Sequence, residues 1–226
     1  MSVLALIPAR GQSKGVERKN LRLLRGAPLI FWTIQAAQQA TGINQVVVST
    51  EDNEIAAVAR SLGVQQPLMR PAELAEDTTP GVAPVLHAAE ELPQFSLILL
   101  LQPTSPMRSV ADIEGILEFQ RRTEAKSVVS VSPVAESPQL FFSLESDNTL
   151  TPLLTEGLDL RRRQDFQQFH KLNGAMYLVE RNWLLEHRTL VNSSTLGYEM
   201  PFERSIDIDT HEDFARAEML MGVTKG

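Results

Sequence analysis

Two clusters of charged residues stand at opposite ends of the sequence, and their side chains have complementary chemistry. The first is basic: residues 1–25 contain six Lys or Arg against one acidic residue, with Gly11 and Gly15 between them. Backbone amides of a glycine-containing loop, together with Arg and Lys side chains, are groups that bind phosphate. The second cluster is the pair Asp207 and Asp209. On an extended strand, alternate residues share a face, so the two carboxylates would project together and suit Mg²⁺ held with substrate phosphates.

The basic loop directly follows Val3–Pro8, an apolar run typical of a strand that is buried on both faces. Open α/β sheets bind ligands at the carboxyl ends of their strands, which favours phosphate binding over a merely solvated basic segment. The order of Gly and Lys is not that of a Walker loop, and Gly11 and Gly15 do not supply the dinucleotide-binding pattern. We therefore expect a phosphate-binding loop of another type, in which the contacts come from Arg10, Ser13, Lys14 and Lys19.

Short apolar runs alternate with helical patterns through the first 130 residues. Strands are predicted at Val3–Pro8, Gln45–Ser49 and Leu97–Leu101, and helices from Pro28, over Asn53–Leu62, over Val82–Leu92 and from Val110. This alternation predicts an α/β fold with a doubly wound, mostly parallel sheet and helices on both faces. We expect strands again at Asn173–Val179 and Glu203–Ile208, followed by a terminal helix that begins at Thr210 with Asp213 in a capping-box position.

The length of 226 residues and an apolar share of 43% favour one globular domain that spans residues 1–226. After Val131 the regular alternation weakens, with prolines and serines marking turns and short apolar stretches between them. We expect residues 132–172 to form an excursion from the main sheet, on the side where a second substrate would bind. Its apolar side chains fit a dimer interface, and a hairpin folded over the chain's own core fits equally well.

The composition excludes several classes of protein. The net charge of −7 does not suit general binding of nucleic acid, and the absence of cysteine excludes disulfides, thiolate metal sites and Cys nucleophiles. The N-terminal stretch lacks the basic region and long apolar core of a signal peptide, and no segment approaches the roughly 20 apolar residues of a membrane span. We expect a cytoplasmic protein that binds neither nucleic acid nor membrane.

The basic loop resembles a known family. The stretch Leu6-Ile-Pro-Ala-Arg10-Gly-Gln-Ser13-Lys14-Gly15, followed by Lys19-Asn20, is similar to the opening of the acylneuraminate cytidylyltransferases, which activate sialic-acid-type sugars. Further stretches resemble the family in the expected order: Arg70-Pro-Ala-Glu-Leu74, Gln102-Pro-Thr-Ser-Pro106, Arg163-Gln-Asp165 with Asn173-Gly-Ala175, and Ser205–Thr210. The family usually has Gly-Gly at Gly11-Gln12, and often a Lys after Ser137-Pro138, where this chain has Gln139. The second departure bears on the identity of the sugar.

The resemblance implies a Rossmann-like nucleotidyltransferase fold, a homodimer and a reaction between CTP and a small acidic sugar. A nonulosonic acid of the sialic, pseudaminic or legionaminic type would attack the α-phosphate through its anomeric hydroxyl, releasing pyrophosphate. The resemblance assigns the triphosphate to Arg10, Ser13, Lys14 and Lys19, other nucleotide contacts to Asn20 and Arg70, the sugar to Gln102, Arg163 and Asn173, and Mg²⁺, or Mn²⁺ in its place, to Asp207 and Asp209. Arg10, Lys14, Lys19 and Asp209 would be the catalytic residues.

Three other functions stay open on the sequence. The enzymes that activate 3-deoxy-octulosonate perform the same chemistry, although their first loop typically reads differently. Asp207-Ile-Asp209-Thr210 superficially matches the nucleophile loop of haloacid-dehalogenase-type phosphatases, but in that class the motif follows the first strand of the fold. A non-catalytic nucleotide-binding module would keep the basic loop without needing the two aspartates.

Overall fold

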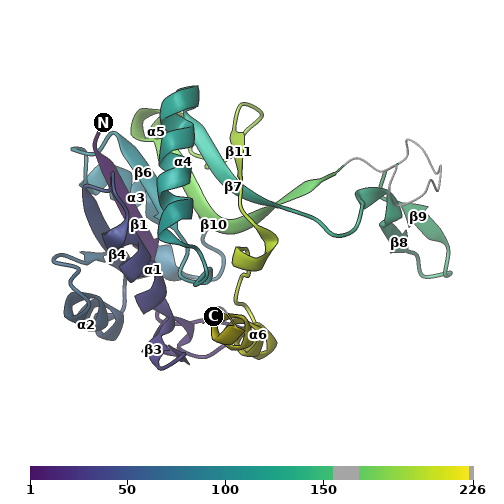
Figure 1. The fold of residues 1–226 in the computed structure, drawn as a ribbon, viewed down its shortest axis with the longest axis horizontal. Helices are drawn as coiled ribbons and strands as arrows, with labels where there is room; N and C mark the ends of the chain where they lie inside the picture. The colour runs from purple at the N-terminus through teal and green to yellow at the C-terminus, as the bar shows by residue number, and fades with distance from the viewer. Residues whose placement is uncertain (155–167, 224–226) are drawn as a thin grey trace.

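The computed structural model describes residues 1–154 and 168–223. Its main element is a seven-stranded sheet in the order β11-β7-β10-β6-β1-β4-β5 (Figure 1). These strands span, in chain order, β1 Val3–Pro8, β4 Gln45–Thr50, β5 Leu68–Met69, β6 Leu97–Leu101, β7 Ser127–Pro133, β10 His170–Glu180 and β11 Leu196–Glu199. Every neighbouring pair is parallel except those of β10, which runs antiparallel to both β6 and β7. The mostly parallel sheet predicted from the sequence is therefore confirmed.

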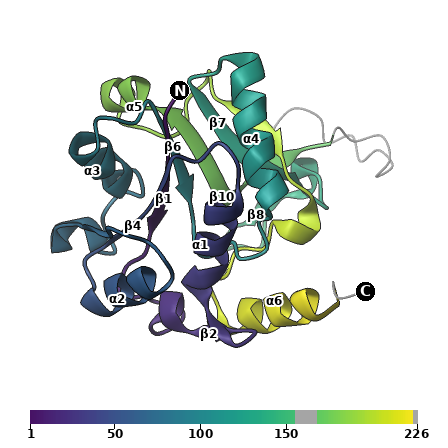
Figure 2. The same cartoon turned by 60° about the vertical axis from the view of Figure 1, so that its left-hand side comes forward.

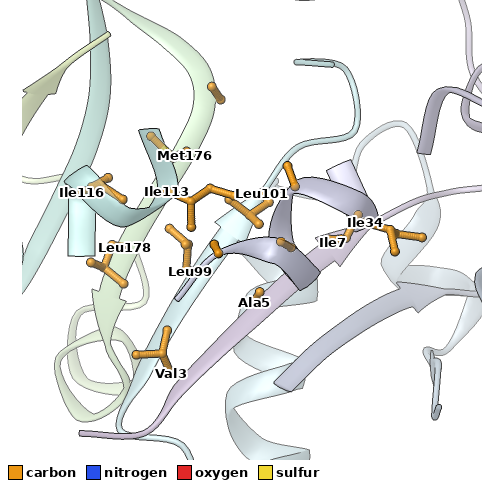
Figure 3. Packing of buried hydrophobic residues seen from close by; sticks show 14 of the residues in the cluster. Val3, Ala5, Ile7, Ile34, Leu99, Leu101, Ile113, Ile116, Met176 and Leu178 are labelled. Carbon is orange, nitrogen blue, oxygen red and sulfur yellow. The ribbon is translucent and has the colours of Figure 1, made fainter. Parts of the chain in front are cut away.

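Helices cover both faces of this sheet, as the alternating pattern predicts (Figure 2). The helices are α1 Leu29–Gln39, α2 Asn53–Ser61, α3 Ala83–Glu91, α4 Val110–Thr123, α5 Arg181–His187 and α6 His211–Val223. Alternate residues of a strand point to opposite faces. Val3, Ala5 and Ile7 of β1 accordingly pack in the cluster that includes side chains of α1, α2 and α4 (Figure 3), while Leu4 and Leu6 pack with α3 and α5.

The central strands read as continuous apolar runs because both of their faces are buried. All five residues of β6, Leu97–Leu101, are buried, and so are the first five of β1. A strand that is apolar on both faces holds its position only between two helical layers, so the ends of β1, β4 and β6 are fixed relative to one another. The loops that leave these ends are therefore delivered to one edge of the sheet.

Local side-chain caps set the starts of several helices. Asp52 accepts a hydrogen bond from the amide of Ile55 at the start of α2, and Ser109 forms a reciprocal capping box with Asp112 at the start of α4. Thr210 and Asp213 make the same exchange before α6, as predicted: the Thr210 amide donates to Asp213 and the Asp213 amide donates to the Thr210 hydroxyl.

The strand predicted over Glu203–Ile208 is wrong. Phe202–Arg204 form a 3₁₀ helix, and residues 205–209 run without strand pairing along the loop that follows β6, where the Ile208 amide donates to the Thr104 carbonyl. Burial alternates along the segment even so: Ile206 and Ile208 are buried, whereas Asp207 and Asp209 are open to the cleft described below. The alternation that the sequence shows is real, but the segment lies beside a loop and not beside a strand, so it cannot join the sheet.

The excursion after β7 is a separate hairpin. β8 Phe142–Leu144 pairs antiparallel with β9 Leu150–Pro152, and these strands share no hydrogen bonds with the main sheet. Figure 1 shows the hairpin standing well away from the body of the protein, beyond the ends of β7 and β10. Its apolar side chains are exposed and do not cover the chain's own core; they include Phe141, Phe142, Leu144, Leu150, Leu153 and Leu154.

None of the helices within the described residues has the length and apolar character needed to cross a bilayer.

Candidate functional site

A cleft of ≈ 620 Å³ opens at the carboxyl ends of β1 and β6, the edge at which open α/β sheets bind ligands. The loop after β1 forms one wall, and the segment between β5 and α3 forms another. Asp207 and Asp209 face the same cleft from the far end of the sequence. Eight residues predicted to bind nucleotide or metal lie around it together: Arg10, Ser13, Lys14, Lys19, Asn20, Arg70, Asp207 and Asp209.

The basic loop and the acidic pair are in direct contact. Lys19 Nζ lies 2.9 Å from Asp209 Oδ1 and donates to the Ile208 carbonyl oxygen at 2.8 Å. Gly15 comes so close to the carbonyl oxygen of Asp209 that a Cβ at this position would overlap it. Cationic groups from the first loop and anionic groups from the last loop therefore meet at one wall of the cleft.

Two acidic residues that follow β4 hold the ends of the basic loop. Glu51 accepts a hydrogen bond from the Gly11 amide at 2.6 Å and two from the guanidinium of Arg70, at 2.9 and 3.2 Å. Asp52 pairs with Arg18, whose backbone is left-handed with φ 50. Glu51 and Asp52 are not among the site residues predicted from the sequence. Their signal was available, because they directly follow a buried strand just as Arg10 follows β1.

Asn20 and Arg70, predicted as nucleotide contacts, are both buried at the edge of the cleft. The Asn20 amide donates to the Arg10 carbonyl oxygen at 2.9 Å, which fixes the start of the basic loop to its end. Arg70 is held by Glu51, so its guanidinium has a defined direction. Both residues shape the cleft as well as lining it.

Asp77 is a further residue that our sequence analysis did not find. Its carboxylate lies 2.7 Å from Arg10 Nη1 and 3.3 Å from Lys14 Nζ. Desolvation opposes the charged form of Asp77, but the contacts with Arg10 and Lys14 outweigh it and hold the pKa of this carboxyl below its usual value. Two of the three basic side chains expected to bind phosphate, Arg10 and Lys14, are thus already paired with one acidic side chain of the protein itself.

Asp207 stands in an electrostatically unfavourable position. Loss of hydration, followed by the nearby carboxylates of Asp209 and Asp213, raises the pKa of the Asp207 carboxyl, while a hydrogen bond with Thr104 and the charge of Lys19 oppose this rise. Within the described residues, no group of three or more His, Asp or Glu side chains is arranged to hold a metal. Asp207 and Asp209 could supply the one or two carboxylates that Mg²⁺ typically takes beside substrate phosphates.

A second cavity of ≈ 510 Å³ adjoins the first, and Gln102 and Asp207 line both. Asn173 lies in its wall, 4% exposed, with its amide engaged on both sides: Oδ1 accepts from the Ser130 hydroxyl and the Ala175 amide, and Nδ2 donates to Ser205. The irregular pairing of β10 with β7 between Leu172 and Tyr177 turns this stretch toward the cavity. Gly174, with φ +76, is needed at this bend.

Gln102 sits at the junction of the two cavities, and a buried arginine fixes its backbone. Arg108 donates to the carbonyl oxygens of Gln102 at 3.3 Å and Ala175 at 2.9 Å, and to the Thr33 hydroxyl at 2.8 Å. Burial lowers the pKa of Arg108 to about 9, which leaves it charged at neutral pH. It therefore ties together α1, the end of β6 and the bend in β10.

Basic side chains also line the second cavity. Lys171 and Arg216 are among its residues, and Arg216 stacks over the ring of Phe202 at 5.8 Å. Arg163, predicted as a sugar contact, belongs to residues 155–167 and lies outside the described residues. The second cavity can therefore bind a small acid next to the groups that face the first.

The sheet order and the cleft at its carboxyl edge define an open-sheet α/β protein that binds its ligands at the ends of β1 and β6. A solved CMP-2-keto-3-deoxy-manno-octonic acid synthetase, complexed with CTP, superposes with a TM-score of 0.76 over 99% of both chains at 17% identity, and so shares the fold. The family match extends this: residues 4–221 fit the family described as Cytidylyltransferase, and the chain belongs to it. It is therefore a nucleotidyltransferase, and the expected enzyme class is confirmed.

Named relatives support the same family. The chain is 38% identical to a CMP-N,N'-diacetyllegionaminic acid synthase of Legionella pneumophila, covering 98% of this chain and 97% of that protein. It is 34% identical to an N-acylneuraminate cytidylyltransferase of Escherichia coli, covering 95% of this chain and 51% of that protein. The chain thus spans nearly the whole of the first relative and about half the length of the second. Membership of the cytidylyltransferases, and not of the phosphatases, confirms the resemblance.

Proposed function

We propose that this chain joins CTP to a nonulosonic acid, forming the CMP-sugar and pyrophosphate. The main support for this proposal is that the basic loop meets the acidic pair in one cleft. A second cavity adjoins this cleft at Gln102 and Asp207. One cavity suits a polyphosphate and the other a small acid, so their junction is where the two substrates would react. The match to the legionaminic acid synthase spans nearly the full length of both proteins, which supports a nonulosonic acid of the legionaminic type as the sugar.

On the nucleotide side, Arg10, Ser13, Lys14 and Lys19 would bind the triphosphate. The oxygen of the sugar's anomeric hydroxyl forms a bond to the α-phosphorus and the hydroxyl loses its proton to solvent. The bond between this phosphorus and the bridging oxygen breaks, and pyrophosphate leaves with the electron pair of that bond. Positioning and charge neutralisation carry most of such a reaction. Lys14 and Lys19 supply positive charge where that charge develops.

On the sugar side, we assign Gln102, Asn173 and Arg163 to the binding of the sugar. Gln102 offers both a donor and an acceptor at the junction of the cavities. Because the amide of Asn173 is engaged by Ser130 and Ser205, this residue would mainly hold the shape of the wall. Lys171 and Arg216 add positive charge to the same cavity, which suits the carboxylate of the sugar.

Asp207 and Asp209 fit a divalent cation. Asp207 is a carboxylate whose charged form is disfavoured by its surroundings, and a cation beside it relieves that cost. Mg²⁺, or Mn²⁺ in its place, would supply charge stabilisation on the phosphates when bound. Lys19 already pairs with Asp209 and keeps this carboxylate directed at the cleft.

The test is a pyrophosphate-release assay with CTP and a panel of acidic sugars: sialic, pseudaminic and legionaminic acids and 3-deoxy-octulosonate. We expect turnover with a nonulosonic acid and much slower turnover with the octulosonate. No release of pyrophosphate with any of the nonulosonic acids would contradict the proposal. CTP binding without turnover would favour a non-catalytic module, and phosphate release from a generic ester without CTP would favour a phosphatase.

We further propose that the chain is one domain that forms a homodimer through the hairpin β8–β9. Leu144 and Leu150 are cross-strand partners that are 68% and 60% exposed, an arrangement that a second copy can cover. Sedimentation velocity should give a dimer for the wild type and a monomer for the double variant Leu144→Glu, Leu150→Glu. Met219→Glu, which alters an exposed apolar residue on α6, should stay dimeric. A monomeric wild type would exclude this element as a dimer interface.

A further inference from the structure

Asp77 bridges two residues that the proposed function assigns to the triphosphate. Arg10 Nη1 donates to its Oδ1 at 2.7 Å, and Lys14 Nζ lies 3.3 Å from its Oδ2. Asp77 is 67 positions from Arg10 in the chain, so this contact is made by the fold and not by local sequence. A carboxylate of the protein itself therefore takes up two of the cationic groups that face the cleft.

The turn that carries Asp77 is held by its own hydrogen bonds. The Thr79 amide donates to the Glu76 carbonyl oxygen at 3.1 Å, and the Thr79 hydroxyl donates to that of Glu73 at 2.6 Å. A recess of ≈ 240 Å³ lies between this turn and the basic loop. The turn therefore presents Asp77 to the cations while leaving space beside it.

Asp77 can be displaced from Arg10 and Lys14, because all three side chains are partly exposed. The side chain of Asp77 is 43% exposed and those of Arg10 and Lys14 are 35% and 74% exposed, so water can replace any one of the three partners. Partly exposed ion pairs of this kind are individually weak. By contrast, Arg70 and Glu51 form a more enclosed pair on the same side of the cleft. Asp77 is thus held strongly enough to occupy the cations and weakly enough to be displaced.

Any anion that binds to Arg10 and Lys14 must first displace the carboxylate of Asp77. A single carboxylate or phosphate group would gain little beyond the contacts it replaces. A polyphosphate also reaches Ser13 and Lys19, which line the same cleft, and so gains contacts that Asp77 does not make. This matters because the second substrate of the proposed reaction is itself a carboxylate.

We propose that Asp77 is a resident counter-anion that weakens the binding of every anion at Arg10 and Lys14, so that a polyphosphate, which also reaches Ser13 and Lys19, still binds the basic loop while a single anionic group does not. The inference rests on the proposed function, which assigns Arg10 and Lys14 to the triphosphate. It also gives these two cations a partner to return to when pyrophosphate leaves.

The experiment compares Asp77→Asn, which keeps the shape and removes the charge, with Glu76→Gln as matched control. Glu76 adjoins Asp77 and lines the same cleft, but it has no salt bridge in the described part of the chain. Isothermal titration calorimetry would measure the Kd of inorganic phosphate, pyrophosphate and CTP, and steady-state kinetics would measure inhibition by inorganic phosphate against CTP.

We expect Asp77→Asn to bind inorganic phosphate and pyrophosphate about fivefold tighter, with the inhibition constant of phosphate against CTP falling by the same factor. Glu76→Gln should change each value by less than about twofold. Asp77→Glu retains the charge and should keep the wild-type affinities. Thermal melting of each variant checks that it folds.

Unchanged or weaker binding of phosphate and pyrophosphate by Asp77→Asn, with CTP still bound by the wild type, would overturn this inference and leave the proposed function standing. If Asp77 acts as a counter-anion, phosphate and pyrophosphate should bind more weakly to Asp77→Glu than to Asp77→Asn. A wild type that binds neither CTP nor pyrophosphate would overturn the proposed function and this inference together.

Discussion

Lys19 and Asp209 lie 190 positions apart in the chain and form an ion pair, with 2.9 Å between Nζ and Oδ1. The lysine side chain is 13% exposed and the aspartate 73%, so the lysine is the fixed partner and the carboxylate faces the cleft. The hydrogen bond from the same Nζ to the Ile208 carbonyl oxygen anchors the backbone that carries the acidic pair. The first loop and the last loop of the fold are thus joined at the point where a polyphosphate would bind.

The acidic pair is tested by Asp209→Asn. We expect it to lower Mg²⁺-dependent turnover by more than about a hundredfold, because the variant loses a carboxylate beside the phosphates. The measurement is pyrophosphate release as a function of Mg²⁺ concentration. Glu212→Gln removes an acidic side chain three positions away on α6 and serves as control. Full activity of Asp209→Asn would refute the metal assignment.

The basic loop is tested by Lys14→Ala. Since Lys14 would stabilise charge on the departing pyrophosphate, we expect kcat to fall about tenfold or more, while the KM for the sugar stays within about twofold of wild type. Lys126→Ala removes a surface lysine that pairs with Glu180 and should leave both parameters unchanged. Normal turnover in Lys14→Ala would remove its proposed role.

The close approach of Gly15 to Asp209 predicts a steric variant. A Cβ at Gly15 would overlap the Asp209 carbonyl oxygen, so Gly15→Ala should push the basic loop away from the acidic pair and lower kcat/KM by about tenfold or more. At Gly81, which also lines the cleft, a Cβ would meet open space, and Gly81→Ala is the matched control. Equal kinetics for the two variants would show that the narrow spacing is not required.

Two aspartates should affect stability in opposite directions. The pKa of Asp207 is raised, so the folded state holds its proton more tightly than the unfolded state, and its ionised form destabilises the metal-free protein above the ordinary carboxyl pKa. Asp207→Asn should therefore raise Tm at pH 7 by ~1–2 °C, and by less near pH 4. Thermal melts without metal across this range measure the effect, and a lower Tm at pH 7 would contradict it.

Asp112 is the opposite case. Desolvation opposes its ionised form, but hydrogen bonds from Arg204 and Ser109 outweigh this and lower the pKa of the Asp112 carboxyl. Its contribution to stability is complete above the ordinary carboxyl pKa and is lost as pH falls through the lowered one. Asp112→Asn replaces one carboxylate oxygen with an NH₂ donor, so it loses one of the two 2.8 Å bonds from Arg204 together with the negative charge, and should cost about 1–3 kcal/mol at pH 7. A cost that grew on acidification would refute this assignment.

The sequence by itself determined the elements and the chemistry. Continuous apolar runs specified β1 and β6 as strands buried on both faces, and the helices from Val110 and Thr210 begin where their capping residues stand. The positive charge of residues 10–19 and the pair of carboxylates at 207 and 209 also follow from residue type and spacing. These features are local, so a short stretch of chain carries enough information to predict them.

Only the tertiary structure decided which of these groups meet. The pairing of Lys19 with Asp209, the bridge from Asp77 to Arg10 and the clamp of Glu51 on Gly11 and Arg70 each join segments that share no local pattern. The segment before Thr210 is a further example. Its apolar and acidic residues alternate as in a strand, but it lies beside the loop at Thr104 and pairs with no strand. Side-chain alternation reports which residues face inward, whereas hydrogen-bond partners depend on what packing brings alongside, and that is settled by the whole fold.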